Sequence, residues 1–198
     1  VNLWVHGQHL LADGVKMAKS TGNSFTMADI EQRDIDPLAF RYLCLTARYN
    51  TRLNFTFTSL KAAQQALLRL RNRVWEWEAL PDLPEGHQEA RSEWEKRFVE
   101  RVDDNLDMPG ALAVTWALVH SELHGRLKLD VLRSYDRILG LGLDNVSERY
   151  RVDGDVLGTV RRRAGIRDRG RYDDADALRE DLAGAGVVVE DTREGTRV

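Results

Sequence analysis

Apolar residues with helical spacing begin at residue 60 and predict a long amphipathic helix. Six of them recur at alternating spacings of three and four, which places them on one face: Leu60, Ala63, Leu67, Leu70, Val74 and Trp77. The segment LPDLPEGHQ, residues 80–88, contains two of the four prolines in the chain and predicts a loop after this helix. We expect the apolar face to form part of a helical core.

Further amphipathic helices follow this loop. Ser92-x-x-Glu95 is a capping box that predicts the start of one helix, and Pro109 predicts the start of the next. Their apolar faces consist of Trp94, Phe98 and Val102 in the first and of Leu112, Trp116, Val119 and Leu123 in the second. A shorter helix over about 128–139 is expected to end at Gly140. Helices with short links predict an antiparallel bundle, with its tryptophans in the core.

Shorter elements precede the bundle. Residues 3–17 alternate loosely between apolar and polar and contain Asp13-Gly14, a pair that favours a tight hairpin turn. Thr26-x-x-Asp29 resembles a capping box and predicts a short helix.

A second helix is expected over the segment LAFRYLCLTA, because Asp36-Pro37 before it places a capping residue ahead of a proline at the first helical position. The segment RLNFTFTS, residues 52–59, predicts a short extended connection to the bundle.

The character of the chain changes after GLGLDNVSERYRVDG, residues 140–154. Two helices are expected at about 154–164 and 172–184, followed by a strand over Val187–Glu190, a turn at TREG and a return strand at TRV. The sequence therefore predicts a mainly α fold in three parts. Residues 1–58 hold the hairpin and connecting segments, residues 59–146 the bundle, and residues 147–198 a small α+β module.

Composition describes an ordinary water-soluble protein of 198 residues, 42% hydrophobic and 31% charged, without an apolar run long enough to cross a membrane. The single cysteine, Cys44, excludes an internal disulfide and a cysteine-based metal cluster. It lies in the apolar run RYLCLTA, which favours a buried thiol. A reducing, cytoplasmic setting is expected.

Charge is unevenly distributed although the net charge is only −3. Residues 151–171 contain seven arginines and three aspartates, whereas residues 172–198 contain eight acidic residues and three arginines. A basic stretch of this kind can bind phosphates. Interleaved charges can equally solvate a helix, and composition alone favours that interpretation.

Two lysines three residues apart, Lys16 and Lys19, lie in the segment DGVKMAKSTGN, residues 13–23. Each ammonium is a compact charge, and backbone N–H groups of a tight loop add donors, so such a loop can neutralise a polyphosphate. It can also stabilise the charge on a departing pyrophosphate. Two solvated surface lysines are the alternative for any K-x-x-K pair, but the full string K-M-x-K-S-x-G-N is far more specific.

The remaining candidate motifs are weaker. His120 and His124 have the i, i+4 spacing of a helical zinc motif, but Ser121 stands where that motif needs glutamate, so we interpret them as bundle-surface histidines. His6 and His9 have no visible third ligand, and no metal site is predicted. The segment GLGL, residues 140–143, lacks a preceding strand and is interpreted as a helix stop.

Four blocks together resemble the cysteinyl-tRNA synthetase family, which belongs to the class I aminoacyl-tRNA synthetases. They occur in the order of that family and span nearly the whole chain: LWVHGQHLLADGVKMAKSTGN with its KMSKS-like signature, DPLAFRYLCLTARYNTRLNFT, DDNLDMPGALAV and GVVVEDTREGTR. Ala18 replaces the middle serine of the signature, which removes one hydroxyl but neither positive charge.

The resemblance implies that Lys16 and Lys19 act catalytically on ATP, with Mg²⁺, during formation of cysteinyl-adenylate. The ATP-binding loop would consist of Lys16, Met17, Ala18, Lys19, Ser20 and Asn23. Residues 24–58 resemble a stem-contact region, and the bundle and terminal module resemble the anticodon-binding part. Candidates for contacts to cysteine tRNA are Arg161, Arg162, Arg163, Arg167, Asp191 and Arg197. They would contact phosphates and unpaired bases.

Two features of the family are not found in these residues: the HIGH-type nucleotide motif and the Cys/His/Glu zinc site. We therefore expect cysteine activation to need a further part of the enzyme, and this chain alone to be inactive. Truncation, proteolysis and separate encoding are all compatible with this expectation. Two other functions are open: a non-catalytic RNA-binding module derived from a synthetase, and a relative that joins cysteine to an amino-sugar. The second is disfavoured by the segment EDTREGTR.

Overall fold

The computed structural model describes residues 2, 4–18, 24–82, 86–144, 146, 159–160, 162–163, 165–167, 169–184, 189–192 and 195–197. The chain divides into two compact units, Val1–Ser147 and Glu148–Val198. The division into three parts at residues 58 and 146 stays a prediction. No helix within the described ranges has the length and apolar character needed to cross a membrane.

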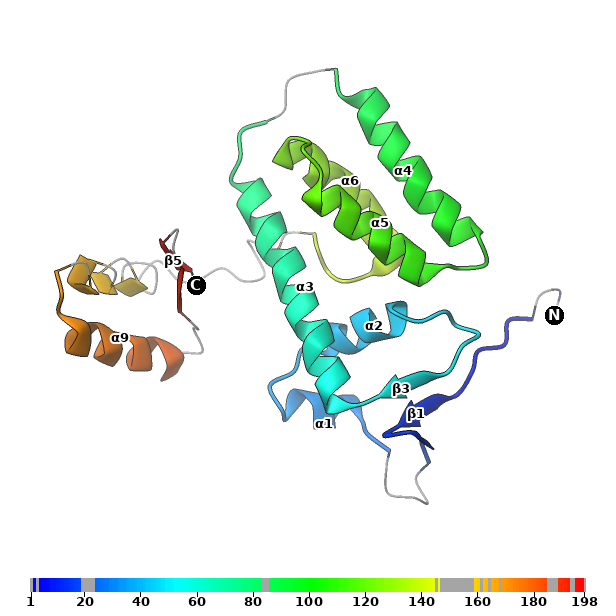
Figure 1. Cartoon of the computed structure of the whole chain (residues 1–198), viewed down its shortest axis with the longest axis horizontal. Coiled ribbons are helices and arrows are strands. Elements are labelled where there is room, and N and C mark those ends of the chain that lie inside the picture. The colour runs from blue at the N-terminus through cyan, green and yellow to red at the C-terminus, as the bar shows by residue number, and fades with distance from the viewer. Residues whose placement is uncertain are drawn as a thin grey trace. The chain divides into compact units, whose positions relative to one another are not determined.

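The mainly α class predicted from the sequence is confirmed (Figure 1). The helices of the first unit are α1 (Met27–Glu31), α2 (Pro37–Leu45), α3 (Phe57–Glu78), α4 (Gln88–Asp103), α5 (Met108–His120) and α6 (Gly125–Leu139). The strands of this unit are β1 (Leu10–Ala12), β2 (Val15–Lys16) and β3 (Leu53–Phe55). The second unit contains α9 (Tyr172–Gly184), β4 (Glu190–Thr192) and β5 (Gly195–Arg197).

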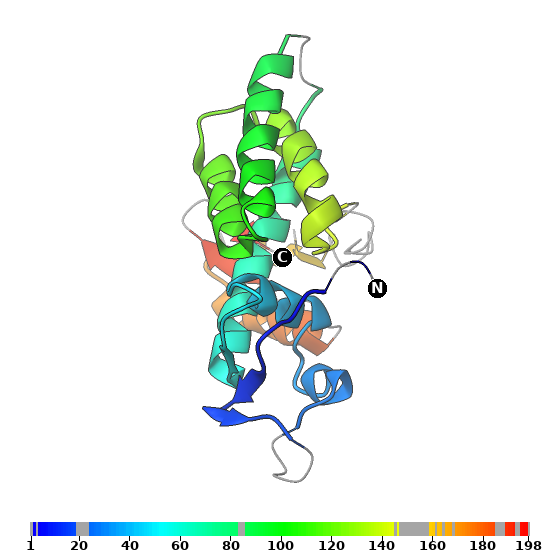
Figure 2. The same cartoon turned by 90° about the vertical axis from the view of Figure 1, so that its right-hand side faces the viewer.

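A three-stranded sheet in the order β2-β1-β3 lies at one end of the first unit. β1 and β2 form the predicted hairpin, in which Asp13 and Gly14 adopt φ angles of 50° and 80°. Positive φ at both central residues is the geometry that matches the twist of a two-residue hairpin. The expected extended connection is β3, which pairs in parallel with β1. Figures 1 and 2 show α3 running from this sheet into the bundle.

Side-chain caps begin the first three helices. The Thr26 hydroxyl accepts a hydrogen bond from the Asp29 amide at the start of α1, and Asp36 accepts one from the Leu38 amide at the start of α2, as predicted. Thr56 and Ser59 form a further capping box that begins α3. Each cap pairs an amide that the first helical turn leaves without an intrahelical partner.

The bundle of α3, α4, α5 and α6 has its core where the sequence predicted it. All six residues of the apolar stripe on α3 are buried, and Phe98 of α4 stacks on Tyr135 of α6 with ring centroids 4.0 Å apart. The Tyr135 hydroxyl donates to the Trp94 carbonyl at 2.6 Å. Burial raises the pKa of this phenol well above its usual range.

Several details of the prediction are wrong. α4 begins at Gln88 rather than at Ser92, because the residues between them favour helix and extend it by a turn. α5 ends at His120, so Leu123 packs against the core from outside that helix. Trp75 is 58% exposed instead of lying in the core.

Cys44 is exposed, which also contradicts the sequence interpretation. Its neighbours Tyr42 and Leu43 occupy the buried face of α2, and the next residue of a helix points away from that face. The surrounding chain still desolvates the thiol and raises its pKa, an effect that Arg41 opposes.

The end of α6 confirms that the segment GLGL is a helix stop. Gly140 adopts the left-handed conformation at φ 61°, as glycine does after many helices. The two carboxylate oxygens of Asp136 accept hydrogen bonds from the amides of Leu141 and Leu143, each at 2.7 Å. Both leucines are fully buried, so the chain turns back into the core after the helix.

Two arginines from other helices bind the carbonyl groups at this end of α6. Arg41 of α2 donates to the carbonyls of Leu139 and Ile138. Arg71 of α3 donates to the Leu141 carbonyl at 3.4 Å and pairs with Asp36, the cap of α2, at 2.5 Å. The terminal carbonyls of a helix have no intrahelical partner, so these contacts satisfy them and join α2, α3 and α6.

A turn with positive φ at Asn105 and Leu106 joins α4 to α5. Asp107, which caps α5 through the Gly110 amide, is buried and pairs with Arg48 at 3.1 Å. The Tyr49 hydroxyl donates to the Asn105 side chain at 2.8 Å. Arg48 and Tyr49 follow α2, so this turn is held by the segment that leads to β3.

We predict that Arg71→Leu destabilises the protein by about 3 kcal/mol, because it removes the cation that pairs with Asp36 and the donor to the buried Leu141 carbonyl. The matched control is Arg73→Leu on the same helix, where the exposed Arg73–Glu76 pair has a side-chain exposure of 50% for arginine. That change should cost less than about 1 kcal/mol. Urea unfolding of both variants measures the difference, and equal losses would contradict the structural role of Arg71.

Candidate functional site

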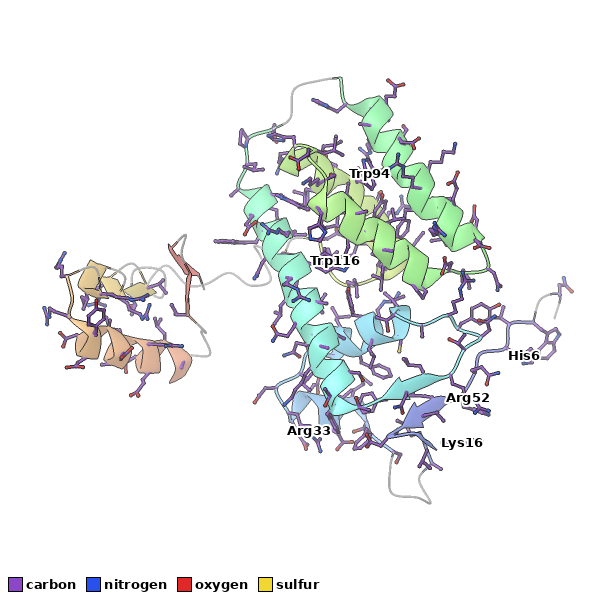
Figure 3. The ribbon with its side chains drawn as sticks, viewed as in Figure 1. His6, Lys16, Arg33, Arg52, Trp94 and Trp116 are labelled. Atoms are coloured by element: carbon purple, nitrogen blue, oxygen red, sulfur yellow. The ribbon has the colours of Figure 1, made fainter. Side chains whose placement is uncertain are left out.

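Lys16, the first lysine of the signature, lies on β2 with an exposed side chain at the edge of the small sheet (Figure 3). It is paired across the hairpin with Leu11, and the Met17 amide donates to the Leu10 carbonyl just beyond it. The local sequence produces this geometry because Asp13-Gly14 closes the hairpin two residues before the lysine. The hairpin therefore fixes the backbone from which Lys16 extends.

β3 supports the tip of this hairpin. The Asn54 side-chain oxygen accepts a hydrogen bond from the Gly14 amide at 2.8 Å, and the Asp13 amide donates to the Phe55 carbonyl at 3.1 Å. Both contacts join the turn to β3. Gly14 and Asn54 are 40 residues apart in the sequence. Sequence reasoning missed Asn54. The sequence did contain a signal for it: Asn54 lies in the predicted extended segment RLNFTFTS, and asparagine is depleted in strands.

An aromatic cluster packs around Phe25, which follows the signature loop in the sequence. Phe25 lies 5.0 Å from Phe57 and 5.6 Å from Phe55 between ring centroids, and Phe40 of α2 lies 6.0 Å from Phe55. Such edge and tilted contacts stabilise aromatic pairs beyond the area they bury. β3 and the start of α3 therefore contact the chain segments before and after residues 19–23.

The other predicted residues of the loop differ in what the structure describes. Met17 and Ala18, which follow β2 in the sequence, are half-buried. Lys19, Ser20 and Asn23 lie outside the described residues. Their roles, and that of Lys16, stay predictions.

The second unit has a small core formed by Val160, Leu182 and Val189. α9 confirms the helix predicted at 172–184, and residues 159, 160, 162, 163 and 165–167 are helical as well. β4 and β5 pair antiparallel with Glu190 opposite Arg197; β4 lies later in the sequence than the predicted strand, and β5 begins one residue before the predicted return strand.

The predicted RNA-binding residues of this unit fall into three groups. Arg162 and Arg167 are exposed on the helical segment before α9, whereas Arg163 is only 2% exposed and offers almost no surface to a ligand. Asp191 and Arg197 lie on β4 and β5, but their side chains are outside what the structure describes. Arg161 also lies outside the described residues.

The histidine pair is not arranged as a helical metal motif. His120 ends α5, where it stacks on Trp116 at 5.7 Å, whereas His124 caps α6, so the expectation that both share one helix is wrong. Both are exposed, as predicted. His6 stacks on Trp4. Among the described residues, no group of three His, Cys, Asp or Glu side chains could hold a metal ion.

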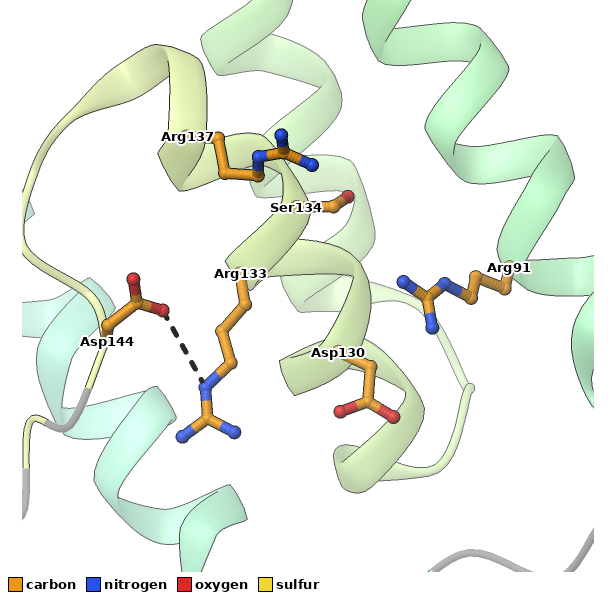
Figure 4. A pocket seen from close by; sticks show the side chains of 6 residues that line it. All are labelled: Arg91, Asp130, Arg133, Ser134, Arg137 and Asp144. Carbon is orange, nitrogen blue, oxygen red and sulfur yellow. Dashed lines mark ion pairs between the residues drawn. The ribbon is translucent and has the colours of Figure 1, made fainter.

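A polar hollow of about 370 Å³ lies beside α6 (Figure 4). It is lined by Arg91, Asp130, Arg133, Ser134, Arg137 and Asp144. Arg91 pairs with Glu95 at 2.9 Å, and Arg133 pairs with Glu78 at 2.9 Å and with Asp144 at 4.0 Å. Most of its positive charge is therefore compensated by neighbouring carboxylates, and the hollow has no marked preference for an anion.

Two family models match separate parts of the chain. Residues 1–65 match the class I tRNA synthetase (C) catalytic domain, and residues 157–198 match the cysteinyl-tRNA ligase anticodon-binding domain. The first match contains the Lys16 hairpin, β3 and the start of α3. The second contains the arginine-bearing segment, α9 and the terminal hairpin.

Curated relatives align along the whole chain. A cysteine–tRNA ligase 1 of Burkholderia lata is 42% identical and aligns with 100% of this chain and 41% of its own length. Cysteine–tRNA ligases of Leptospira interrogans and Borrelia turicatae are each 32% identical, with 45% and 44% of their own lengths aligned. The chain thus spans less than half the length of these relatives.

We predict that Asn54→Ala weakens the hairpin turn, because the Gly14 amide loses its acceptor. A hydrogen bond of this kind contributes about 1 kcal/mol, so hydrogen exchange at the Gly14 amide should accelerate about fivefold. Asn54→Asp keeps an acceptor oxygen at the same position and is the matched control. Unchanged exchange at Gly14 in the alanine variant would show that β3 does not hold the turn.

Proposed function

We propose that this chain, which belongs to the cysteinyl-tRNA synthetase family, forms the part of a cysteine–tRNA ligase that assists ATP-dependent cysteine activation and binds cysteine tRNA. The observation that carries the proposal is that Lys16, the first lysine of the signature, lies on a supported hairpin within the segment matched by the catalytic-domain model. The anticodon-binding match at the other end of the chain supports the tRNA contact.

The proposed role of Lys16 is electrostatic. When the cysteine carboxylate attacks the α-phosphate of ATP, the bond to pyrophosphate breaks and negative charge grows on the departing group. An ammonium held by a rigid hairpin stabilises this charge without reorganising during the step. Lys19 would add a second charge from the same loop, and Mg²⁺ would accompany ATP as its usual counterion.

The full enzyme is expected to bind zinc as well as ATP. The described residues offer no cluster of three ligand side chains, and the single cysteine lies exposed on α2. We propose that this zinc ion is held by another part of the enzyme. The residues of this chain contribute charge and positioning.

The proposed tRNA contact rests on the charge of the second unit. Arg162 and Arg167 are exposed, whereas the adjoining helix α9 begins with Asp173 and Asp174, which favour its positive N-terminus. We propose that the exposed guanidinium groups of Arg162 and Arg167 contact RNA phosphates. A purely non-catalytic RNA-binding module would need these arginines but not the lysine signature, so we favour the ligase.

We predict that Lys16→Ala or Lys19→Ala lowers cysteine-dependent ATP–pyrophosphate exchange by roughly 2–4 kcal/mol of transition-state stabilisation. The assay needs an enzyme that joins this chain to the portion its relatives carry beyond it. Lys96→Ala on α4 removes an exposed lysine elsewhere and should leave exchange unchanged. Normal exchange in both signature variants would overturn the catalytic role.

We also predict that the chain binds cysteine tRNA in a salt-dependent way, because arginine–phosphate contacts release counterions. The double change Arg162→Ala with Arg167→Ala should reduce the slope of log affinity against log salt by about 1.5. Arg179→Ala, on the acidic helix α9, is the control and should not alter it. Absence of any binding by the unaltered chain at low salt would overturn the tRNA assignment.

A further inference from the structure

Two consecutive residues in the turn between α4 and α5 have positive φ, although neither is glycine. Asn105 adopts φ 52° and Leu106 adopts φ 53°. This left-handed conformation is uncommon for side chains other than those of asparagine and aspartate, and for leucine it costs free energy. Leu106 is also 45% exposed, so burial of its side chain offsets little of that cost. A turn of this kind persists where the structure around it fixes its backbone.

The contacts around the α4–α5 turn do fix it. The Asp107 amide donates to the carbonyls of Arg101 and Asp104, at 3.0 and 3.1 Å. The buried Asp107 carboxylate pairs with Arg48 at 3.1 Å and lies 3.6 Å from Arg101. A side chain at Gly110 would collide with this carboxylate, so the first turn of α5 packs closely against it. The α4–α5 turn is therefore a rigid point at one end of the bundle.

Tyr49 joins this turn to the segment that leads into the Lys16 hairpin. Its hydroxyl donates to the Asn105 side-chain oxygen at 2.8 Å, and its backbone carbonyl accepts a hydrogen bond from the Gln8 amide at 2.9 Å. A Cβ on Gly7 would lie 3.4 Å from the same carbonyl, so the segment runs directly beside Tyr49. Gln8 lies two residues before β1, which pairs with the strand that carries Lys16. One residue thus contacts both the bundle and the entry to β1.

The β1 strand is consequently supported at both ends. Beyond its last residue, the amides of Asp13 and Gly14 bind β3. Before its first residue, the Gln8 amide binds Tyr49. Figure 3 labels His6 and Lys16, which lie before and after these supports in the sequence. Contacts at both ends fix the direction of a strand of only three residues, and with it the backbone from which Lys16 extends.

We infer that Tyr49 is a positioning residue for the lysine to which we assign the charge stabilisation. Its hydroxyl anchors the segment between α2 and β3 to the α4–α5 turn, and its carbonyl holds the entry to β1. Tyr49 acts through Gln8 and β1, not by touching ATP. A charge that stabilises a transition state acts only from the correct place, so a small displacement that begins far from the chemistry lowers the rate. The inference rests on the proposed function and names a residue on which the proposed role of Lys16 depends.

A contribution to stability alone is the alternative for the Tyr49–Asn105 hydrogen bond. Tyr49 is 36% exposed, so its ring adds little to the apolar core. Its hydroxyl instead joins two segments 56 residues apart in the sequence, one of them held directly against the entry to β1. The positioning role therefore predicts a loss of rate that depends on the lysine, whereas a stabilising role predicts a loss that does not.

Cysteine-dependent ATP–pyrophosphate exchange by the full enzyme tests this role. Tyr49→Phe removes only the hydroxyl and should lower kcat about two- to tenfold, the factor for one lost hydrogen bond, with KM for cysteine unchanged. Asn105→Gly removes the acceptor without strain at positive φ and should have the same effect. Asn105→Asp keeps an acceptor oxygen and should keep the activity. Tyr172→Phe, the same change at an exposed tyrosine of α9, is the matched control and should not alter exchange.

The same substitution in the Lys16→Ala enzyme separates the two roles. If Tyr49 acts through Lys16, Tyr49→Phe should change kcat less in this background than in the unaltered enzyme, because residues that act as a unit are not additive. An equal factor in both backgrounds would assign Tyr49 to general stability and overturn the inference. Circular dichroism melting of each variant excludes unfolding at the assay temperature as the cause of lost activity.

The outcomes distinguish this inference from the proposed function. If Lys16→Ala or Lys19→Ala lowers pyrophosphate exchange but Tyr49→Phe does not, the positioning role is wrong and the proposed function stands. If both lysine variants exchange normally, the proposed function and the inference are overturned together. Amide hydrogen exchange of the chain provides a check without catalysis: exchange at the Gln8 amide should accelerate in Tyr49→Phe. An unchanged rate at Gln8 would contradict the positioning role.

Discussion

The carbonyl groups at the end of α6 impose the constraint on which the first unit depends. Three leucines, Leu139, Leu141 and Leu143, are fully buried there, so the backbone around them cannot be hydrated and must find partners within the protein. Arg41 and Arg71 supply donors from α2 and α3, and Asp136 supplies acceptors for the amides. The bundle and the segment before it are thereby joined by hydrogen bonds as well as by apolar packing.

The same arrangement gives the signature hairpin a rigid base. α2 is capped by Asp36, which Arg71 holds, and it presents Phe40 to Phe55 of β3. β3 in turn pairs with β1 and accepts the hydrogen bond from the hairpin turn through Asn54. A continuous set of contacts therefore leads from the bundle core to the backbone that carries Lys16. In the proposed catalytic role, this support would fix the backbone from which the Lys16 side chain extends.

The proposed ligands of this chain, ATP and tRNA, are both polyanions. Three of the candidate cations have exposed side chains: Lys16, Arg162 and Arg167. Elsewhere, Arg91 and Arg97 of α4 and Arg133 of α6 pair with carboxylates. The net charge of −3 is a sum over the whole chain and does not describe these local surfaces.

The sequence by itself determined the features that depend on residues close together in the chain. The caps of α1 and α2, the Asp13-Gly14 turn, the apolar stripe of α3 and the stop at Gly140 were predictable, since each acts within one or two turns, whereas the cap predicted at Ser92 was wrong. Only the tertiary structure decided that β3 joins β1 in parallel, that Asn54 holds the hairpin and that Arg71 binds the end of α6. These depend on contacts between segments tens of residues apart, and local spacing carries no information about which partner a side chain will meet.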